Sequence, residues 1–123
     1  MITGVVRPSR EAIVGLRLRG TSAVEIDVEA VLDTGFTEYL TLPLALVNSL
    51  ALPRVNTDKV ILADGKTVGV DLYEGVVIWD GQDRAIIVHC MEGSPLIGMS
   101  LLYDHLLTME VVDSGPVSID AIP

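Results

Sequence analysis

Short segments of alternating apolar and polar residues, separated by turn residues, follow one another along the whole chain. In residues 24–32, apolar residues alternate with Glu, Asp and Glu, which is the period of a strand with one face in solvent. Residues 12–19 alternate in the same way, and the Gly20-Thr21-Ser22 turn between the two segments predicts a hairpin. The pattern therefore favours antiparallel sheet over long helices.

The same reasoning predicts further strands and two short helices. Strands are expected at residues 37–41, 59–63, 67–79, 84–90, 108–112 and 116–122. Asp64-Gly65 and Asp80-Gly81 suit tight hairpin turns. Pro43 suits the first turn of a helix that fades by residues 52–53, and residues 99–105 form a second candidate helix. The predicted fold class is all-β with one or two short helices.

Composition agrees with a sheet protein of one domain. The chain has 17 Val, 10 Ile and 8 Thr, and such β-branched residues favour strands. Half of the residues (50%) are hydrophobic but only 4% are aromatic, so aliphatic side chains must build the core. With 123 residues, we expect a single domain that spans residues 1–123.

The balance of charge and the cysteine count exclude several partners. A net charge of −9 at pH 7 repels phosphate groups, so neither nucleic acid nor an anionic membrane is an expected partner. Cys90 is the one cysteine, and together with two histidines it lacks the spacing of a zinc site, so we expect no metal and no other cofactor. No apolar run is long enough to span a bilayer, and residues 1–10 lack the order of a signal peptide. These features favour a cytoplasmic protein.

The candidate chemistry lies where an apolar segment runs directly into Asp33-Thr34-Gly35. A carboxylate at the end of a core strand needs groups that satisfy it, and a glycine allows backbone N–H groups to approach it. Asp, Thr and Gly are also ordinary turn residues, so the triplet by itself favours a simple turn over a catalytic site. Asp33 is therefore a candidate catalytic residue, with a structural turn as the alternative.

A second motif adds to this hypothesis. Leu96-Ile97-Gly98 is an apolar pair followed by glycine, just before a predicted helix. Together with Leu32-Asp33-Thr34-Gly35 it resembles the single-domain retropepsin-like aspartic proteases. The resemblance covers most of the chain, and it extends to small bacterial and archaeal members in which Phe-Thr and then Leu-Pro follow the triplet, as at residues 36–37 and 42–43. It implies the acid-protease fold, a closed β-barrel that works as a homodimer.

The resemblance implies a role for each matching residue. Asp33 would be the catalytic carboxylate, Thr34 would hydrogen-bond to the partner subunit, and Gly35 would admit the substrate backbone. Ile97-Gly98 would pack beneath the active-site loop. Asp64-Gly65 would form the tip of a flap over the substrate.

Three positions depart from the retroviral pattern. Met99 and Ser100 stand where retroviral members have Arg followed by Asp or Asn, so the ionic bracing of the following helix is absent or replaced. Phe36 stands where those members have Ala, and its ring offers no hydrogen-bond donor to the carboxylate.

In retroviral members the chain ends interleave between subunits. Residues 1–6 and 117–122 are apolar enough to do this, although another mode of dimerisation stays open.

The mechanism of this family needs two carboxylates that share one proton, one to activate water and one to protonate the substrate carbonyl. A two-fold dimer would bring two copies of Asp33 together on its axis. Asp113-Ser114-Gly115 has a similar form, but Pro116 follows at once and no apolar-apolar-Gly segment lies downstream, so a turn explains it. The sequence thus predicts a homodimeric aspartic endopeptidase that hydrolyses peptides or proteins.

Two other functions stay open. A non-catalytic peptide-binding or dimerisation module could use the same fold, because fold does not determine function. A small all-β structural domain could also carry the triplet by accident. Peptide binding without turnover would indicate the module, and a monomer at high concentration would indicate the structural domain.

Overall fold

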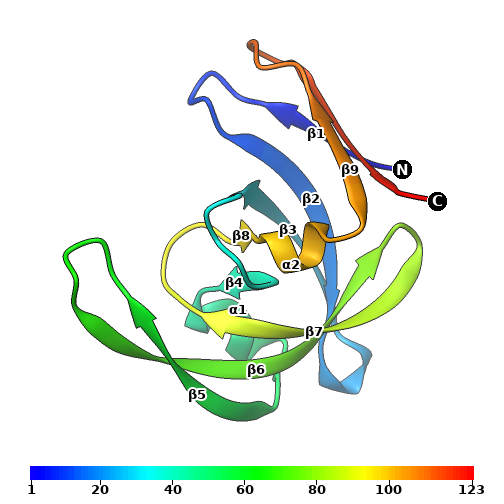
Figure 1. Cartoon of the computed structure of the whole chain (residues 1–123). Helices are drawn as coiled ribbons and strands as arrows, with labels where there is room; N and C mark the ends of the chain where they lie inside the picture. The colour runs from blue at the N-terminus through cyan, green and yellow to red at the C-terminus, as the bar shows by residue number, and fades with distance from the viewer.

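Ten strands join in one sheet in the computed structural model, which describes residues 1–123 (Figure 1). The strands are β1 (Ile2–Val6), β2 (Ala12–Arg19), β3 (Glu25–Leu32), β4 (Leu40–Leu42), β5 (Arg54–Ile61), β6 (Thr67–Trp79), β7 (Gln82–Cys90), β8 (Leu96–Ile97), β9 (His105–Met109) and β10 (Pro116–Ala121). The helices are α1 (Leu44–Ser49), α2 (Met99–Leu102) and a 3₁₀ turn at Thr21–Ala23. The prediction of an all-β fold with short helices is confirmed, and neither α-helix is long and apolar enough to cross a membrane.

The sheet closes partly on itself. Its strand order is β5-β6-β7-β4-β8-β3-β2-β1-β10-β9, and β6 pairs in addition with β2. Most neighbouring strands are antiparallel, but β3 with β8 and β4 with β7 are parallel. Because β6 has 13 residues, it reaches from its hairpin with β5 to the closing contact, where Leu18 faces Val77.

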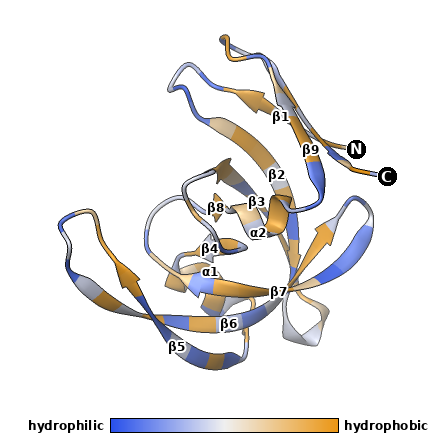
Figure 2. Ribbon diagram, in the orientation of Figure 1, coloured by the Kyte–Doolittle hydropathy of each residue, from blue (hydrophilic) through white to orange (hydrophobic).

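The core is aliphatic apart from one tryptophan, as the composition requires. Alternation along β2 buries Leu16 and Leu18, whereas Arg17 points outward and pairs with Asp27 of β3 at 2.8 Å. Trp79 is the aromatic member of the 19-residue core cluster. Figure 2 shows hydrophilic residues gathered at hairpin ends such as the turn between β6 and β7.

Some boundaries differ from the sequence predictions for physical reasons. The strand expected at residues 37–41 begins only at Leu40, because the preceding carbonyl groups accept hydrogen bonds from residues 98–100. The second helix ends at Leu102, and Asp104 then takes a φ of 64°, so β9 starts earlier than expected. β5 begins at Arg54, earlier than the predicted residue 59. The sequence does not mark this start, because the strand is paired along one edge only, is exposed over nearly all its length and has no buried face.

The two ends of the chain lie side by side (Figure 1). β1 pairs with β10 on one edge, from Ile2 opposite Ile119 to Val5 opposite Pro116, and with β2 on the other. β10 lies between β1 and β9. Both terminal strands therefore have both edges paired inside one chain, and β9 forms an edge of the sheet.

We expect Leu18→Ala to lower the free energy of unfolding by about 2–5 kcal/mol. Leu18 is 3% exposed and lies where β2 meets both β3 and β6, so its loss leaves a cavity at the closing contact. Leu44→Ala is the matched control, because Leu44 is 45% exposed, and it should change stability by less than about 1 kcal/mol. Urea unfolding measures both. Equal losses in the two variants would contradict this account of the closure.

Candidate active site

The loop between β3 and β4 carries the triplet and is fixed by its own hydrogen bonds. The N–H of Asp33 donates to the carbonyl of Ile97 at 2.9 Å, continuing the parallel pairing of β3 with β8. The Oδ1 atom of Asp33 accepts the N–H of Gly35 at 2.9 Å, and the Asp33 carbonyl accepts the N–H of Phe36 at 3.1 Å. Asp33 is half-buried as a residue, and the N–H of Gly35 orients its carboxylate.

Residues 98–100 hold the second half of this loop. They donate four hydrogen bonds to its carbonyl groups: Gly98 N–H to Tyr39 at 3.0 Å, Met99 N–H to Phe36 at 2.8 Å, Ser100 N–H to Glu38 at 3.2 Å, and the Ser100 hydroxyl to Thr37. Three consecutive residues thus bond to the carbonyl groups of all four residues from 36 to 39. α2 and residues 36–39 therefore form one unit.

Position 98 has room only for glycine. A Cβ atom there would lie 2.0 Å from the carbonyl oxygen of Glu38 and 2.6 Å from the ring of Phe36. Ile97 is fully buried and pairs with Leu32 and Leu40. The structure therefore places Ile97-Gly98 directly against the loop that carries Asp33.

Thr34 and Gly35 lie on the outer side of the loop. Both residues are exposed to solvent in the single chain, whereas Asp33 beside them is half-buried. A partner or substrate can therefore reach the Thr34 hydroxyl and the Gly35 backbone without any change in the loop.

β5 and β6 form a long hairpin that projects from the rest of the sheet (Figure 1). At its tip, the Oδ1 atom of Asp64 accepts the N–H of Lys66 at 2.9 Å, and Leu62 and Lys66 join through a backbone hydrogen bond. Gly65 has a φ of +84°, a conformation that favours glycine. Asp64-Gly65 therefore occupies the tip of a projecting hairpin, far along the sequence from Asp33.

His89 connects this hairpin with the loop. Its side chain is buried, and its Nε2 atom lies 3.7 Å from a carboxylate oxygen of Asp58 on β5. Its ring packs edge to face on Phe36 with a centroid distance of 5.7 Å, and its Nδ1 atom has no hydrogen-bond partner. Sequence analysis missed this contact. The available signal was a histidine that directly follows the apolar run of residues 85–88.

An ion pair at the base of the hairpin joins β5 to β6. Arg54 Nη2 and the Thr57 hydroxyl each donate to Oδ1 of Asp71 at 3.0 Å. These hydrogen bonds, that of Arg54 first, hold the pKa of Asp71 below its ordinary value of 3.8. The charged carboxylate therefore contributes to the pairing of the two arms.

The other candidate groups are not arranged for catalysis. Burial, followed by the nearby carboxylates of Glu92 and Asp71, raises the pKa of the Cys90 thiol, which disfavours a reactive thiolate. His105 is occupied by hydrogen bonds to Trp79 and Tyr103. No cluster of three or more His, Cys, Asp or Glu side chains could hold a metal ion.

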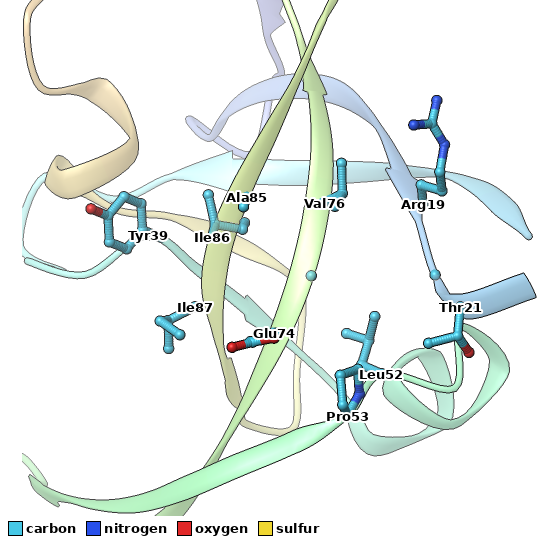
Figure 3. A pocket seen from close by; sticks show the side chains of 12 residues that line it. Arg19, Thr21, Tyr39, Leu52, Pro53, Glu74, Val76, Ala85, Ile86 and Ile87 are labelled. Carbon is cyan, nitrogen blue, oxygen red and sulfur yellow. The ribbon is translucent and has the colours of Figure 1, made fainter. Parts of the chain in front are cut away.

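A hollow of about 460 Å³ lies elsewhere, between the β6–β7 ribbon and the chain around Pro53 (Figure 3). Arg19, Thr21, Leu52 and Glu74 are among its lining residues. None of the triplet residues lines it. Tyr39, at the end of the active-site loop, does line it, so the hollow borders that loop but does not contain the triplet.

The fold matches that of a known protease. The crystal structure of a retropepsin-like aspartic protease from Rickettsia conorii superposes with a TM-score of 0.61 and 13% identity, over 97% of this chain and 89% of that chain. No family model and no curated protein sequence matches the chain. The chain thus has the retropepsin-like fold that its sequence predicts, and at this identity the match shows the fold.

We expect Gly98→Ala to lower the free energy of unfolding by about 1–3 kcal/mol, because the new Cβ atom displaces the carbonyl of Glu38. Gly15→Ala is the matched control. A Cβ atom at Gly15 meets nothing within 4 Å, so that variant should stay within about 1 kcal/mol of the original protein. Urea unfolding measures both variants. A Gly98→Ala protein as stable as the control would show that the contact is not tight.

Asp71→Asn should destabilise the protein at neutral pH but not in strong acid. A carboxylate whose pKa is lowered in the folded state adds stability above its unfolded pKa and loses it as the pH falls through the folded pKa. The difference in the free energy of unfolding between the variant and the original protein should therefore shrink below pH 3.8 and then vanish. Urea midpoints from neutral to acid pH measure it, with Asp113→Asn as the control. A difference that persists in strong acid would contradict the ion-pair account.

Proposed function

We propose that this chain is an aspartic endopeptidase whose active site forms when two copies each contribute Asp33. The observation that carries the proposal is the position of this residue. Asp33 directly follows a strand of a retropepsin-like fold, its carboxylate is oriented by Gly35, and its backbone is anchored to Ile97. The hydrogen bonds from Gly35 and Phe36 to Asp33 also occur in ordinary turns, whereas the bond to Ile97 ties this turn to β8 in the core.

The chemistry follows from two carboxylates held about 3 Å apart, which do not ionise together and so share one proton. The ionised carboxylate takes a proton from a water molecule, and the water oxygen attacks the carbonyl carbon of the peptide bond. The protonated carboxyl group donates to the carbonyl oxygen. As the tetrahedral intermediate collapses, the C–N bond breaks and the amine nitrogen receives a proton.

One chain has one Asp33, so this mechanism requires a dimer with the active site on its two-fold axis. The exposure of Thr34 and Gly35 supports such an arrangement, because a partner loop can contact them directly. In the dimer, the Thr34 hydroxyl would hydrogen-bond to the partner's loop and hold the two carboxylates in register.

The substrate would be a peptide or protein segment in an extended conformation. Such a segment can add its backbone to a strand edge, as in other β-strand recognition. The projecting β5–β6 hairpin would act as the flap, with Asp64-Gly65 at its tip. Ile61 and Leu62 beside the tip are 74% and 38% exposed, and would offer apolar contact to the substrate.

Asp33→Asn should reduce kcat/KM on a cleaved peptide by at least about a hundredfold, because an amide cannot act as the base. Asp113→Asn is the matched control, since Asp113 belongs to the other Asp-Ser/Thr-Gly segment, and it should retain activity within about twofold. Unfolding midpoints check that both variants fold. Near-normal turnover by the Asp33 variant would overturn the proposal, and peptide binding without turnover by the original protein would indicate the non-catalytic module.

Sedimentation at micromolar concentration should give about twice 13.2 kDa, and specific activity should fall on dilution as dimers dissociate. Thr34→Ala should weaken the dimer by about 1–3 kcal/mol per site, because a buried hydroxyl loses its partner. Thr3→Ala, at an exposed position on β1, should leave the dimer unchanged. A monomer that still cleaves peptides would exclude the shared active site.

A further inference from the structure

α2 is too short to hold its own position. It has four residues, and so short a segment is unstable by itself, because helix formation has a costly nucleus. Its first residues nevertheless carry the hydrogen bonds that position residues 36–39. The position of the loop after Asp33 therefore depends on whatever fixes the other end of α2.

Arg84 of β7 fixes that other end. Its Nη1 atom donates to the carbonyl of Leu101 at 2.9 Å, and its Nη2 atom lies 3.3 Å from the carbonyl of Ser100. Carbonyl groups at the end of a helix have no partner within the helix. The planar fork of a guanidinium group can serve two neighbouring acceptors at once, which the ammonium group of a lysine cannot reproduce.

Two aromatic rings fix the guanidinium group in turn. Its Cζ atom lies 5.8 Å from the ring centre of Tyr39 and 5.9 Å from that of Trp79, within the range of cation–π attraction. Tyr39 belongs to the loop unit, because its carbonyl accepts the N–H of Gly98. Arg84 therefore contacts the unit twice, at the end of α2 and at the end of the loop.

The same cluster also holds the chain as it leaves α2. The indole N–H of Trp79 donates to Nε2 of His105 at 3.0 Å. Because an indole nitrogen can only donate, the His105 hydrogen lies on Nδ1, which donates to the carbonyl of Tyr103 at 2.7 Å. Arg84 and His105 together thus satisfy three carbonyl groups at the end of this short helix.

We propose that Arg84 is the positioning residue of the active-site loop. It fixes α2 against the β6–β7 ribbon, and α2 in turn fixes residues 36–39 and the Ile97 carbonyl that anchors Asp33. Arg84 itself contacts neither Asp33 nor a substrate. Its effect on catalysis rests on the proposed function, whereas its effect on the position of the loop does not.

Amide hydrogen exchange tests the positioning role without reference to activity. In Arg84→Met, the N–H groups of Asp33, Met99 and Ser100 should exchange about tenfold faster relative to core amides of β2 and β6, which report global opening. Arg84→Lys keeps the charge but not the planar guanidinium group, so its loop amides should exchange at rates between those of the original protein and those of Arg84→Met. It also provides the measurement if the Met variant does not fold. Arg17→Met is the matched control, since Arg17 pairs with Asp27 on an exposed face, and it should leave these amides unchanged.

Steady-state kinetics test the consequence for catalysis. Arg84→Met should lower kcat about tenfold or more while KM stays within about threefold, because the reacting groups and not the binding surface are displaced. Unchanged exchange at the loop, or equal increases in the loop and the core, would overturn the inference whatever the activity. Faster exchange at the loop in a protein whose original form has no turnover would support Arg84 as the positioning residue and reject the proposed protease.

Discussion

The hydrogen bond from the N–H of Asp33 to the carbonyl of Ile97 is the contact on which the candidate site depends. It exists because β8 runs parallel to β3 and pairs with its last two residues, Val31 and Leu32. Without β8 the end of β3 would have no partner there, and a polar loop would adjoin an apolar core. β8 itself is only two residues long and continues into Gly98 and α2. The carboxylate therefore stands on a segment that needs support from elsewhere in the chain.

Much of that support comes from aromatic and histidine side chains, although the chain has few of them. Four of the five aromatic or histidine rings that make specific contacts surround the loop or its anchor, namely those of Phe36, Tyr39, Trp79 and His89. Phe36 is half-buried and packs edge to face on the buried His89, so its ring is held against β7. Most of the few aromatic and histidine side chains of the sequence are thus concentrated where the loop must be held.

The sequence was sufficient for features that local chemistry determines. Alternation located β2 and β3, and Asp-Gly dipeptides located two turns with the strands beside them. The two motifs that resemble aspartic proteases, around Asp33 and Gly98, lie in contact. Features set by tertiary contacts were not predictable in this way. The parallel pairs need strands of two or three residues that no periodicity reveals, and the contact of His89 with Asp58 joins strands distant in sequence. Met99 indicated that bracing of α2 was absent or replaced, but not that Arg84 of β7 replaces it.

The pairing of the terminal strands constrains how two copies could meet. Interleaved chain ends of the retroviral kind need strand edges that are free to pair with a partner. Here β1 has β2 and β10 on its two edges, and β10 has β1 and β9, so neither strand offers a free edge. Interleaving would have to break the ladder that joins Ile2 to Ile119 and its neighbours, at the cost of backbone hydrogen bonds already made within the chain. A dimer built around Asp33 therefore has to be held together by other surfaces. The proposed mechanism itself requires one part of such an interface, the exposed side of the loop at Thr34 and Gly35.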